Sequence, residues 1–586
     1  MFSLILSTII LWSFRLLLVF PKLESLQAKE RFLQNKPQTK LGQIGTKYIV
    51  YLNYFSIILF FIINLVLVYS YPPTNYDSMT YRLPRSEYWL FNQSIFDLDS
   101  SVPRQSWNPK LAETLQYIVR AFSNSDHYLG LIQLVALVMI ILILHEFTFM
   151  ITNSKFMAST VSFLTLAWPS LSYQATTTQN DLVVSFFIAM GALWMLRFLQ
   201  SNDGRLAITM SVISLSLAIA TKGTALVITA SLFFSILVVR QFRAKLLQKR
   251  YSAFFALIVS GFLIPLLNIG TWIDNYQNFG KFLAPKDLPG YTVTVSRFGL
   301  DGLILSIIRF ISSNLQIQLF GLKQLVDDKT QEFLETISLD ANDPEFTWAG
   351  GYKPVFGNHH DVAQSPVILV CIIAVISSLL IRRKYLSALD YISLFTIISF
   401  FLLVGFLRWQ PWINRLFVPI YVLLMFSISV CTRQSGRIVK SSLVALSLIF
   451  GSTTIFYSTM QMDRPIFKFS AENQVIALDK YIYEDDFTKY FTWNKRGSDR
   501  YLATLKIIEK EKPFAVLIYS GRNSMQYPAI KYLKQFATVL PYEERNSINY
   551  SSESKKYILL CIDECPQLSN KDNSSFTVYK INVFDK

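Results

Sequence analysis

The chain is poor in charged residues for its length. Only 16% of its 586 residues are Asp, Glu, Lys or Arg, whereas a typical soluble domain has about 25%. Hydrophobic residues make up 52% of the chain, and the mean hydropathy is positive. Apolar runs of about 20 residues recur along it, and a helix of that length can cross a lipid bilayer. This composition excludes an ordinary soluble enzyme and predicts a polytopic α-helical membrane protein.

Cysteine is scarce as well, with four in the whole chain. Cys371 and Cys431 fall in apolar runs, where packing is the simplest role. Cys561 and Cys565 stand four residues apart in the C-terminal tail, where a disulfide and free thiols both remain open. No second Cys or His pair follows them, so structural or free thiols are favoured over a zinc site.

Acidic residues are fewer than basic ones, which gives a formal net charge of +16. The basic residues concentrate in short connections between apolar runs, at residues 21–47, 240–250, 382–384 and 433–440. Lys and Arg in short loops mark the cytoplasmic side of a membrane protein. We therefore interpret the charge as a topology signal and reject a nucleic-acid partner.

The apolar runs predict about twelve membrane helices. They lie at residues 2–20, 48–71, 128–150, 156–173, 181–199, 205–221, 224–240, 251–273, 366–382, 387–407, 411–431 and 440–459. Arg15 interrupts the first run and no small-residue cleavage site follows, so a cleaved signal peptide is disfavoured. This helix order puts all the basic loops on one side. The segments expected outside the cytoplasm are the N-terminus, residues 72–127, residues 274–365 and the tail.

Two further segments outside the predicted spans have distinctive patterns. Residues 300–319 are apolar, but an extra span there would move the basic loop 382–384 outside, so we expect an interfacial or partly re-entrant segment. Near residue 460 the composition changes to that of a soluble domain. Its strands are predicted at residues 514–519, 557–562 and 576–584, with a helix at 527–536. Strands alternating with a helix indicate a small α/β domain at 460–586, beside a membrane domain at 1–459.

A short polar stretch after the apolar run that ends near Tyr71 carries the main functional signal. It places Asp77, Arg82 and Arg85 close together, and a second carboxylate, Asp181, opens another membrane helix after a run of Thr, Gln and Asn. Arginine pairs with phosphate through its planar fork, and a carboxylate can serve as a general base. Both acids are expected on one side of the membrane, which suggests chemistry on a lipid-linked phosphate. The simpler alternatives are a solvated loop residue for Asp77 and a helix cap for Asp181.

The segment YDSMTYRLPRSEYWLFNQ, followed by RQSWNPKLAETL, resembles the first outer loop of the GT-C glycosyltransferases. This superfamily includes protein O-mannosyltransferases and aminoarabinose transferases, and the resemblance is nearest to bacterial family 39-like enzymes. Three later segments are also similar: ATTTQNDLVVSFF places Asp181, LAIATKGTALV places Lys222, and RWQPWINRLFVPIYVLL places Arg415. The resemblance covers roughly residues 48–431. Residues 273–280 depart from it, because no Arg precedes their Asn.

The resemblance implies a membrane glycosyltransferase that moves a sugar from a polyprenyl-phosphate donor to an extracytoplasmic acceptor, with inversion. It implies a GT-C-like fold in a bacterial inner membrane, with the active site and the tail outside the cytoplasm. Asp77 would be the base and Asp181 would orient the acceptor. The donor phosphate would be bound by Arg82, Arg85, Lys222 and Arg415. Tyr76 and Glu113 are candidates for the acceptor groove, although a solvated helix face is the simpler expectation for Glu113, as snorkelling is for Lys222.

His359 and His360 precede an aspartate in the long outer loop and are ligand-type residues. Adjacent histidines in a strand point to opposite faces, so a shared metal is disfavoured and the sequence requires no divalent metal. Two other functions stay open: a transporter or flippase of lipid-linked sugars, and a non-catalytic scaffold of the cell envelope. A transporter would carry its polar groups near the membrane midplane, whereas here they gather at the outer face.

Overall fold

The computed structural model describes residues 40–581 with some gaps. The gaps are residues 96–99, 101, 124, 201–203, 239–243, 245–246, 249, 283–292, 316–322, 349, 354, 356, 384–385, 434, 471–474, 493–494, 522, 543–555 and 568–576. The predicted helix 2–20 and most of the basic loops 21–47 and 240–250 lie outside the described residues.

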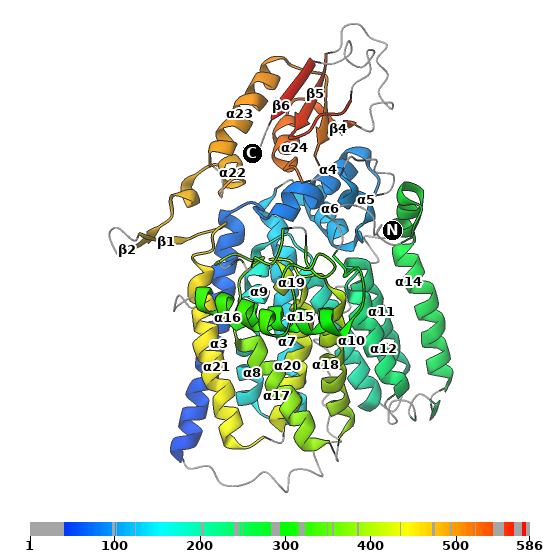
Figure 1. Cartoon of the computed structure of the whole chain (residues 1–586), viewed down its shortest axis with the longest axis vertical. Helices are drawn as coiled ribbons and strands as arrows, with labels where there is room; N and C mark the ends of the chain where they lie inside the picture. The colour runs from blue at the N-terminus through cyan, green and yellow to red at the C-terminus, as the bar shows by residue number, and fades with distance from the viewer. Residues whose placement is uncertain are drawn as a thin grey trace.

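A bundle of long apolar helices forms the main body (Figure 1). They are α3 (Lys40–Ser70), α7 (Leu131–Thr152), α8 (Lys155–Thr165), α10 (Asp181–Gln200), α11 (Arg205–Thr221), α12 (Ala225–Val238), α14 (Arg250–Phe279), α17 (Val367–Arg382), α18 (Ala388–Phe406), α20 (Val418–Arg433) and α21 (Arg437–Ser458). Each coincides with one of the predicted membrane segments. The segment predicted at 156–173 is shorter than expected: α8 ends at Thr165, because Pro169 disfavours helical backbone at the residue before it and starts the separate short helix α9 (Pro169–Ser172).

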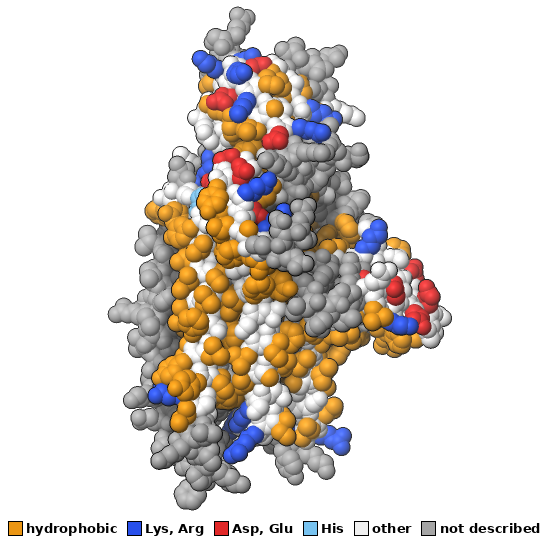
Figure 2. Space-filling model, turned by 90° about the vertical axis from the view of Figure 1, so that its left-hand side faces the viewer, with side chains coloured by type: hydrophobic (Ala, Val, Ile, Leu, Met, Phe, Trp, Pro, Cys, Tyr) orange, Lys and Arg blue, Asp and Glu red, His pale blue; other side chains and the backbone are white. Residues whose placement is uncertain are grey.

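Five helices in the described part of the chain are long and apolar enough to cross a membrane. They span Ile44–Ser70, His127–Thr152, Asp181–Phe198, Leu389–Phe406 and Arg437–Ser458. The full set of about twelve spans stays a prediction. The helices differ in burial: 89% of the apolar window is buried in the Asp181 helix and 28% in the Ile44 helix. On the latter, Phe55, Ile58 and Ile62 stay exposed, and Figure 2 shows that such hydrophobic side chains cover one face of the bundle. Such a face suits contact with lipid.

Two loops that the sequence predicts to lie outside the cytoplasm contain further helices, the first at the upper end of the bundle and the second across its upper part (Figure 1). The first outer loop contains α4 (Leu83–Asn92), α5 (Pro103–Trp107) and α6 (Leu111–Ser123). The long loop contains α15 (Leu300–Leu315) and α16 (Lys323–Thr336), which lie crosswise to the long helices in Figure 1. Leu305 and Phe310 of α15 are buried, whereas Leu300 and Ile311 are exposed. This amphipathic, crosswise placement agrees with an interfacial segment.

The C-terminal part contains a parallel four-stranded sheet in the order β4-β3-β5-β6. Its strands are β3 (Ala515–Ser520), β4 (Thr538–Pro541), β5 (Tyr557–Ile562) and β6 (Thr577–Ile581), with helices α23 (Lys495–Lys510) and α24 (Tyr527–Leu533). A short antiparallel pair, β1 (Phe467–Ser470) and β2 (Val475–Leu478), lies between α21 and this sheet. The three predicted strands and the helix are present, and β4 is the strand that the sequence pattern did not reveal. Chain order reverses between β3 and β5, which creates a topological switch point at their carboxyl ends.

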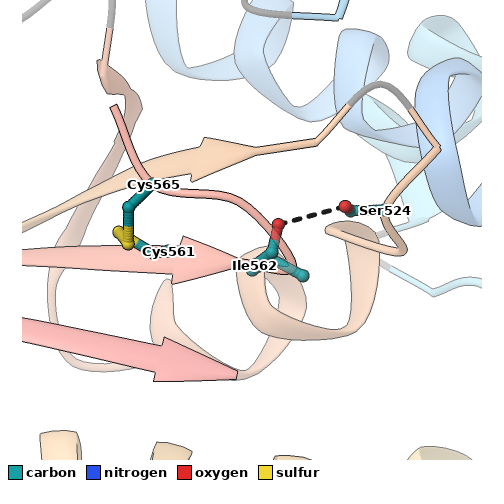
Figure 3. Close-up of a disulfide and its surroundings, with 4 residues drawn as sticks. All are labelled: Ser524, Cys561, Ile562 and Cys565. Atoms are coloured by element: carbon teal, nitrogen blue, oxygen red, sulfur yellow. Dashed lines mark hydrogen bonds between the residues drawn. A yellow bond between two sulfur atoms is a disulfide. The ribbon is translucent and has the colours of Figure 1, made fainter. Parts of the chain in front are cut away.

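The cysteines are now assigned. Cys561 and Cys565 form a disulfide at the end of β5 (Figure 3), which decides the alternative that the sequence left open. Cys371 and Cys431 are free and buried in the bundle, as the packing role predicts.

Candidate active site

Asp77 lies in the segment that follows α3 and is the N-cap residue of the π-helical turn η1 (Ser78–Arg82). Its carboxylate is 7% exposed. Oδ2 lies 2.7 Å from Arg415, and Oδ1 lies 3.5 Å from Arg104 of α5. Burial alone would raise the pKa of this carboxyl, but the guanidiniums of Arg415, Arg104 and Arg82 outweigh it and hold the pKa well below its usual range. Asp77 is therefore an ionised, buried carboxylate surrounded by positive charge.

Arg415 lies in α19 (Ile413–Leu416) and joins two carboxylates. Besides Asp77, it binds Asp361 of the long loop at 2.7 Å. His360 continues the network, with Nε2 3.4 Å from Asp361 and Nδ1 3.2 Å from Asp463. Asp463 follows α21 and pairs with Arg464 at 2.9 Å. Charged groups from the first outer loop, the long loop, α19 and the segment after α21 thus meet at one end of the bundle.

Asp181 and Lys222 form a second ion pair in the same region. The charge of Asp181 also acts on Arg82 and Arg415, which places these groups near one another. The expected capping role of Asp181 is taken by another residue: Gln133 Oε1 accepts hydrogen bonds from the backbone N–H groups of Leu182 and Val183 in the first turn of α10. The carboxylate of Asp181 is therefore available to Lys222 instead of the helix end.

The other sequence-predicted residues lie around Asp77. Arg82 pairs with Glu113 at 2.5 Å, and both side chains are buried. Arg85 is 0% exposed and donates hydrogen bonds to the backbone carbonyls of Gln105, Arg104 and Asn108. These contacts hold the loop before α6 in place, so a role for Arg85 in binding phosphate stays a prediction. Glu113 is 0% exposed, which corrects the expectation of a solvated position.

Sequence reasoning missed Arg104, Asp463 and Arg464. Arg104 is the first residue of the segment RQSWNPKLAETL, which the family resemblance includes. No local pattern in the sequence predicts, however, that Arg104 lies beside Tyr81 and Asp77. In the structure, its guanidinium lies 4.6 Å from the Tyr81 ring centroid. Asp463 and Arg464 follow the last apolar run with no distinguishing motif, and only the fold brings them to His360.

His359, His360 and Asp361 have ligand atoms within 4.8 Å of one another. The strand assumed for them is wrong: the segment consists of bends and turns, and the two imidazole rings lie 4.0 Å apart. Burial and the neighbouring His360 lower the pKa of His359 to about 4. Both carboxylates beside these rings already pair with guanidiniums, Asp361 with Arg415 and Asp463 with Arg464. The donor set fits an ion-pair network better than a cation site.

Several buried polar atoms near Asp181 lack a hydrogen-bond partner among the residues that the structure describes. They include both amide heteroatoms of Gln179, Oδ1 of Asn180, Oδ2 of Asp181 and Nε of Arg82. A buried polar group without a partner is costly.

Comparisons with known proteins give matches among solved structures. No family model matches the chain, and no curated protein matches it. The chain is similar to ArnT from Cupriavidus metallidurans bound to undecaprenyl phosphate, with a TM-score of 0.42 and 12% identity over 83% of this chain and 76% of that one. It is also similar to the Archaeoglobus fulgidus oligosaccharyltransferase in the apo form, with a TM-score of 0.38 and 12% identity over 83% of this chain and 64% of that one.

Since the TM-scores are below 0.5, we draw no functional conclusion from them.

Proposed function

We propose that this protein is a membrane glycosyltransferase that moves a sugar from a polyprenyl-phosphate donor to an acceptor outside the cytoplasm. The observation that carries the proposal is the 2.7 Å pair between Asp77 and Arg415, residues 338 positions apart in the chain. Around this pair lie Arg82, Lys222 and Asp181, which come from separate parts of the sequence. A carboxylate among several cations is the arrangement that an acceptor hydroxyl and a leaving phosphate together require.

The proposed reaction is a single displacement. The acceptor oxygen attacks the anomeric carbon of the sugar while its proton passes to the Asp77 carboxylate. The bond between the anomeric carbon and the phosphate oxygen breaks, and polyprenyl phosphate leaves with the bonding electrons. A phosphate leaving group needs little protonation but much charge stabilisation, which Arg415, Arg82 and Lys222 would supply. One displacement inverts the anomeric centre.

The pairing of Asp77 with Arg415 also suggests an order of events. With its pKa held low by three guanidiniums, Asp77 is a weak base while the donor is absent. A donor phosphate bound to Arg415 would draw off part of that positive charge, and the pKa of Asp77 would rise. Asp77 would then become an effective base only once the donor is bound, so that its basicity would depend on donor binding.

The placement of the charges favours an enzyme over a transporter. A transporter binds its substrate near the membrane midplane, between interrupted helices. Here the charged residues lie at one end of the bundle, in the outer loop, α19 and the segment after α21. We propose that this end and the C-terminal sheet face the outside of a bacterial inner membrane. Cysteine introduced at Ser100 should then react with an impermeant thiol reagent on intact cells, and cysteine at Ser435 should not.

The decisive experiment measures turnover of Asp77→Asn in the purified protein. The substrates would be a radiolabelled polyprenyl-phosphate sugar and a cell-envelope fraction as acceptor. Turnover should fall by about 10²- to 10⁴-fold, the usual contribution of a general base. Asp328→Asn, an exposed carboxylate in α16, is the matched control and should stay active. Full turnover of a well-folded Asp77→Asn protein would refute the catalytic assignment and favour the scaffold or the transporter.

A further inference from the structure

The loop between β3 and α24 lies at the switch point of the C-terminal sheet and faces the candidate active site. Gly521 and residues 523–526 follow the carboxyl end of β3, where doubly wound sheets usually bind ligands. In this protein the loop instead contacts the first outer loop, which carries Asp77. The carboxyl end of the C-terminal sheet, where ligands usually bind in such sheets, therefore contacts the membrane part of the chain.

Gln526 connects this end of the sheet to the π-helical turn that follows Asp77. Its Nε2 donates to the carbonyl of Thr80 at 3.2 Å, and its Oε1 accepts from the Tyr88 hydroxyl at 2.9 Å. Thr80 lies inside η1, between Asp77 and Arg82. A π-helical turn is wider than an α-helical one and often occurs at functional sites. Gln526 thus supports the backbone that positions both charged residues.

Asn523 makes a second, independent connection. Its side-chain Oδ1 accepts a hydrogen bond from Nη2 of Arg104 at 2.9 Å, and its backbone carbonyl accepts one from the Tyr76 hydroxyl at 2.6 Å. The other terminal nitrogen of the same guanidinium, Nη1, lies 3.5 Å from Oδ1 of Asp77. One planar group is thereby held between the C-terminal loop and the proposed base.

The loop is rigidly attached to the sheet. The Ser524 hydroxyl and the Gly521 N–H both donate to the carbonyl of Ile562 at 3.0 Å, and the Cys561–Cys565 disulfide closes the adjoining turn (Figure 3). A Cβ at Gly521 would lie 2.9 Å from the Ser524 hydroxyl and 3.0 Å from Glu564, so glycine permits this close approach. The sheet therefore presents Asn523 from a fixed position.

We propose that the β3–α24 loop is part of the transfer site and that Asn523 is a positioning residue, which holds the Arg104 guanidinium against the Asp77 carboxylate. The inference rests on the proposed function of Asp77. Arg104 then has one fixed orientation, with Nη2 on Asn523 and Nη1 toward Asp77. Because the amide of Asn523 is exposed, its replacement should leave folding intact.

The test compares Asn523→Ala with Asn523→Asp in the full-length purified protein. Asn523→Ala should lower kcat about tenfold, the size expected for one lost hydrogen bond to a charged group. Asn523→Asp keeps an acceptor oxygen for Arg104 and should restore most of the activity. In an Arg104→Ala background, Asn523→Ala should have no further effect, since it acts through that guanidinium. Lys510→Ala, an exposed change on α23, should behave as wild type.

The pH profile separates positioning from simple docking. The groups that face Asp77 are Arg415, Arg104, Arg82, Tyr81 and Asp361. Asn523→Ala should loosen only Arg104, so the acid limb of kcat should move to higher pH in that variant. If Asp77→Asn is inactive, three outcomes would overturn the inference alone. They are a normal kcat in Asn523→Ala, a loss of kcat that Asn523→Asp does not restore, and a loss that adds to that of Arg104→Ala. Full activity of Asp77→Asn would overturn the inference together with the proposed function.

Discussion

Arg415 is a residue whose removal should be costly, because it joins the carboxylates of Asp77 and Asp361. Arg415→Gln leaves Asp77 and Asp361 without their 2.7 Å partner. Removing one member of a buried ion pair typically costs about 3–5 kcal/mol, since the remaining charge stays desolvated. Asp77 retains Arg104 at 3.5 Å and Asp361 retains His360 at 3.4 Å. We therefore expect a loss near the lower end, about 3 kcal/mol in the free energy of unfolding.

Substitution of the partner carboxylate, Asp77, should lower the free energy of unfolding much less. Asp77→Asn leaves Arg415 its second carboxylate, Asp361, so no charge is isolated and a loss of about 1 kcal/mol is expected. In the double variant, the uncompensated charge on Asp77 is gone, and part of the stability lost in Arg415→Gln should return. The coupling between the two sites should be about 1–3 kcal/mol.

The assay is chemical unfolding of the four proteins of this cycle in detergent micelles at neutral pH. Lys329→Gln is the control, because its pair with Glu332 is exposed on α16 and such pairs contribute about 1 kcal/mol or less. Donor binding is measured in parallel with a polyprenyl-phosphate sugar. Additive losses, or Arg415→Gln as stable as wild type, would show that Arg415 does not hold these carboxylates together and would refute the network.

Three further outcomes follow from other parts of the site. Asp77 and Asp463 have pKa values below the usual range, so their contribution to stability is present above the unfolded pKa of about 3.9 and is lost as the pH falls. The free energy of unfolding, measured from pH 7 downward, should therefore decrease below about pH 4, and this decrease should be shallower in Asp77→Asn. Lys222→Met should lower donor affinity and destabilise the protein by leaving Asp181 unpaired, and a thermal-shift assay should show recovery when Asp181→Asn is added. Gln133→Leu removes the acceptor at the start of α10 and should cost about 1 kcal/mol of stability, the usual value of a helix cap, by the same unfolding assay.

Hydropathy was sufficient to predict the helices of the bundle that the structure describes. The apolar segments gave helices at nearly the expected residues, because in a membrane the backbone must satisfy its own hydrogen bonds and long apolar runs can form only helices there. Lys222 marks the break between α11 and α12, as the sequence indicated. The prediction continued the helix α8 beyond Thr165 because the run stays apolar, although Pro169 signals a boundary. No pattern indicated that Thr538–Pro541 forms a short strand.

The orientation of α6 shows why the site was harder to predict. The helical spacing of Leu111, Leu115 and Ile118 suits a helix lying along the membrane surface, and a solvated face was the simpler expectation for Glu113. In the structure, Glu113 is buried, together with other polar residues of the helix, whereas Leu115 and Ile118 are only half-buried. The polar side of this helix packs against charged partners from distant segments. Periodicity identifies the two faces of a helix, but it does not say which of them finds a partner.

The burial of charged residues explains why the loop that carries Asp77, the segment of α19 and the C-terminal part have to fold together. A carboxylate such as Asp77 at 7% exposure is stable only beside cations, and its cations come from α5 and α19. The first outer loop in turn carries Asp126 and Glu87, which pair with Lys531 and Lys534 of the C-terminal part. No single segment can bury these charges alone, so each becomes stable only when the others are in place. Charged residues that look solvated in the sequence thereby connect the membrane bundle to the C-terminal sheet, and the site forms where they meet.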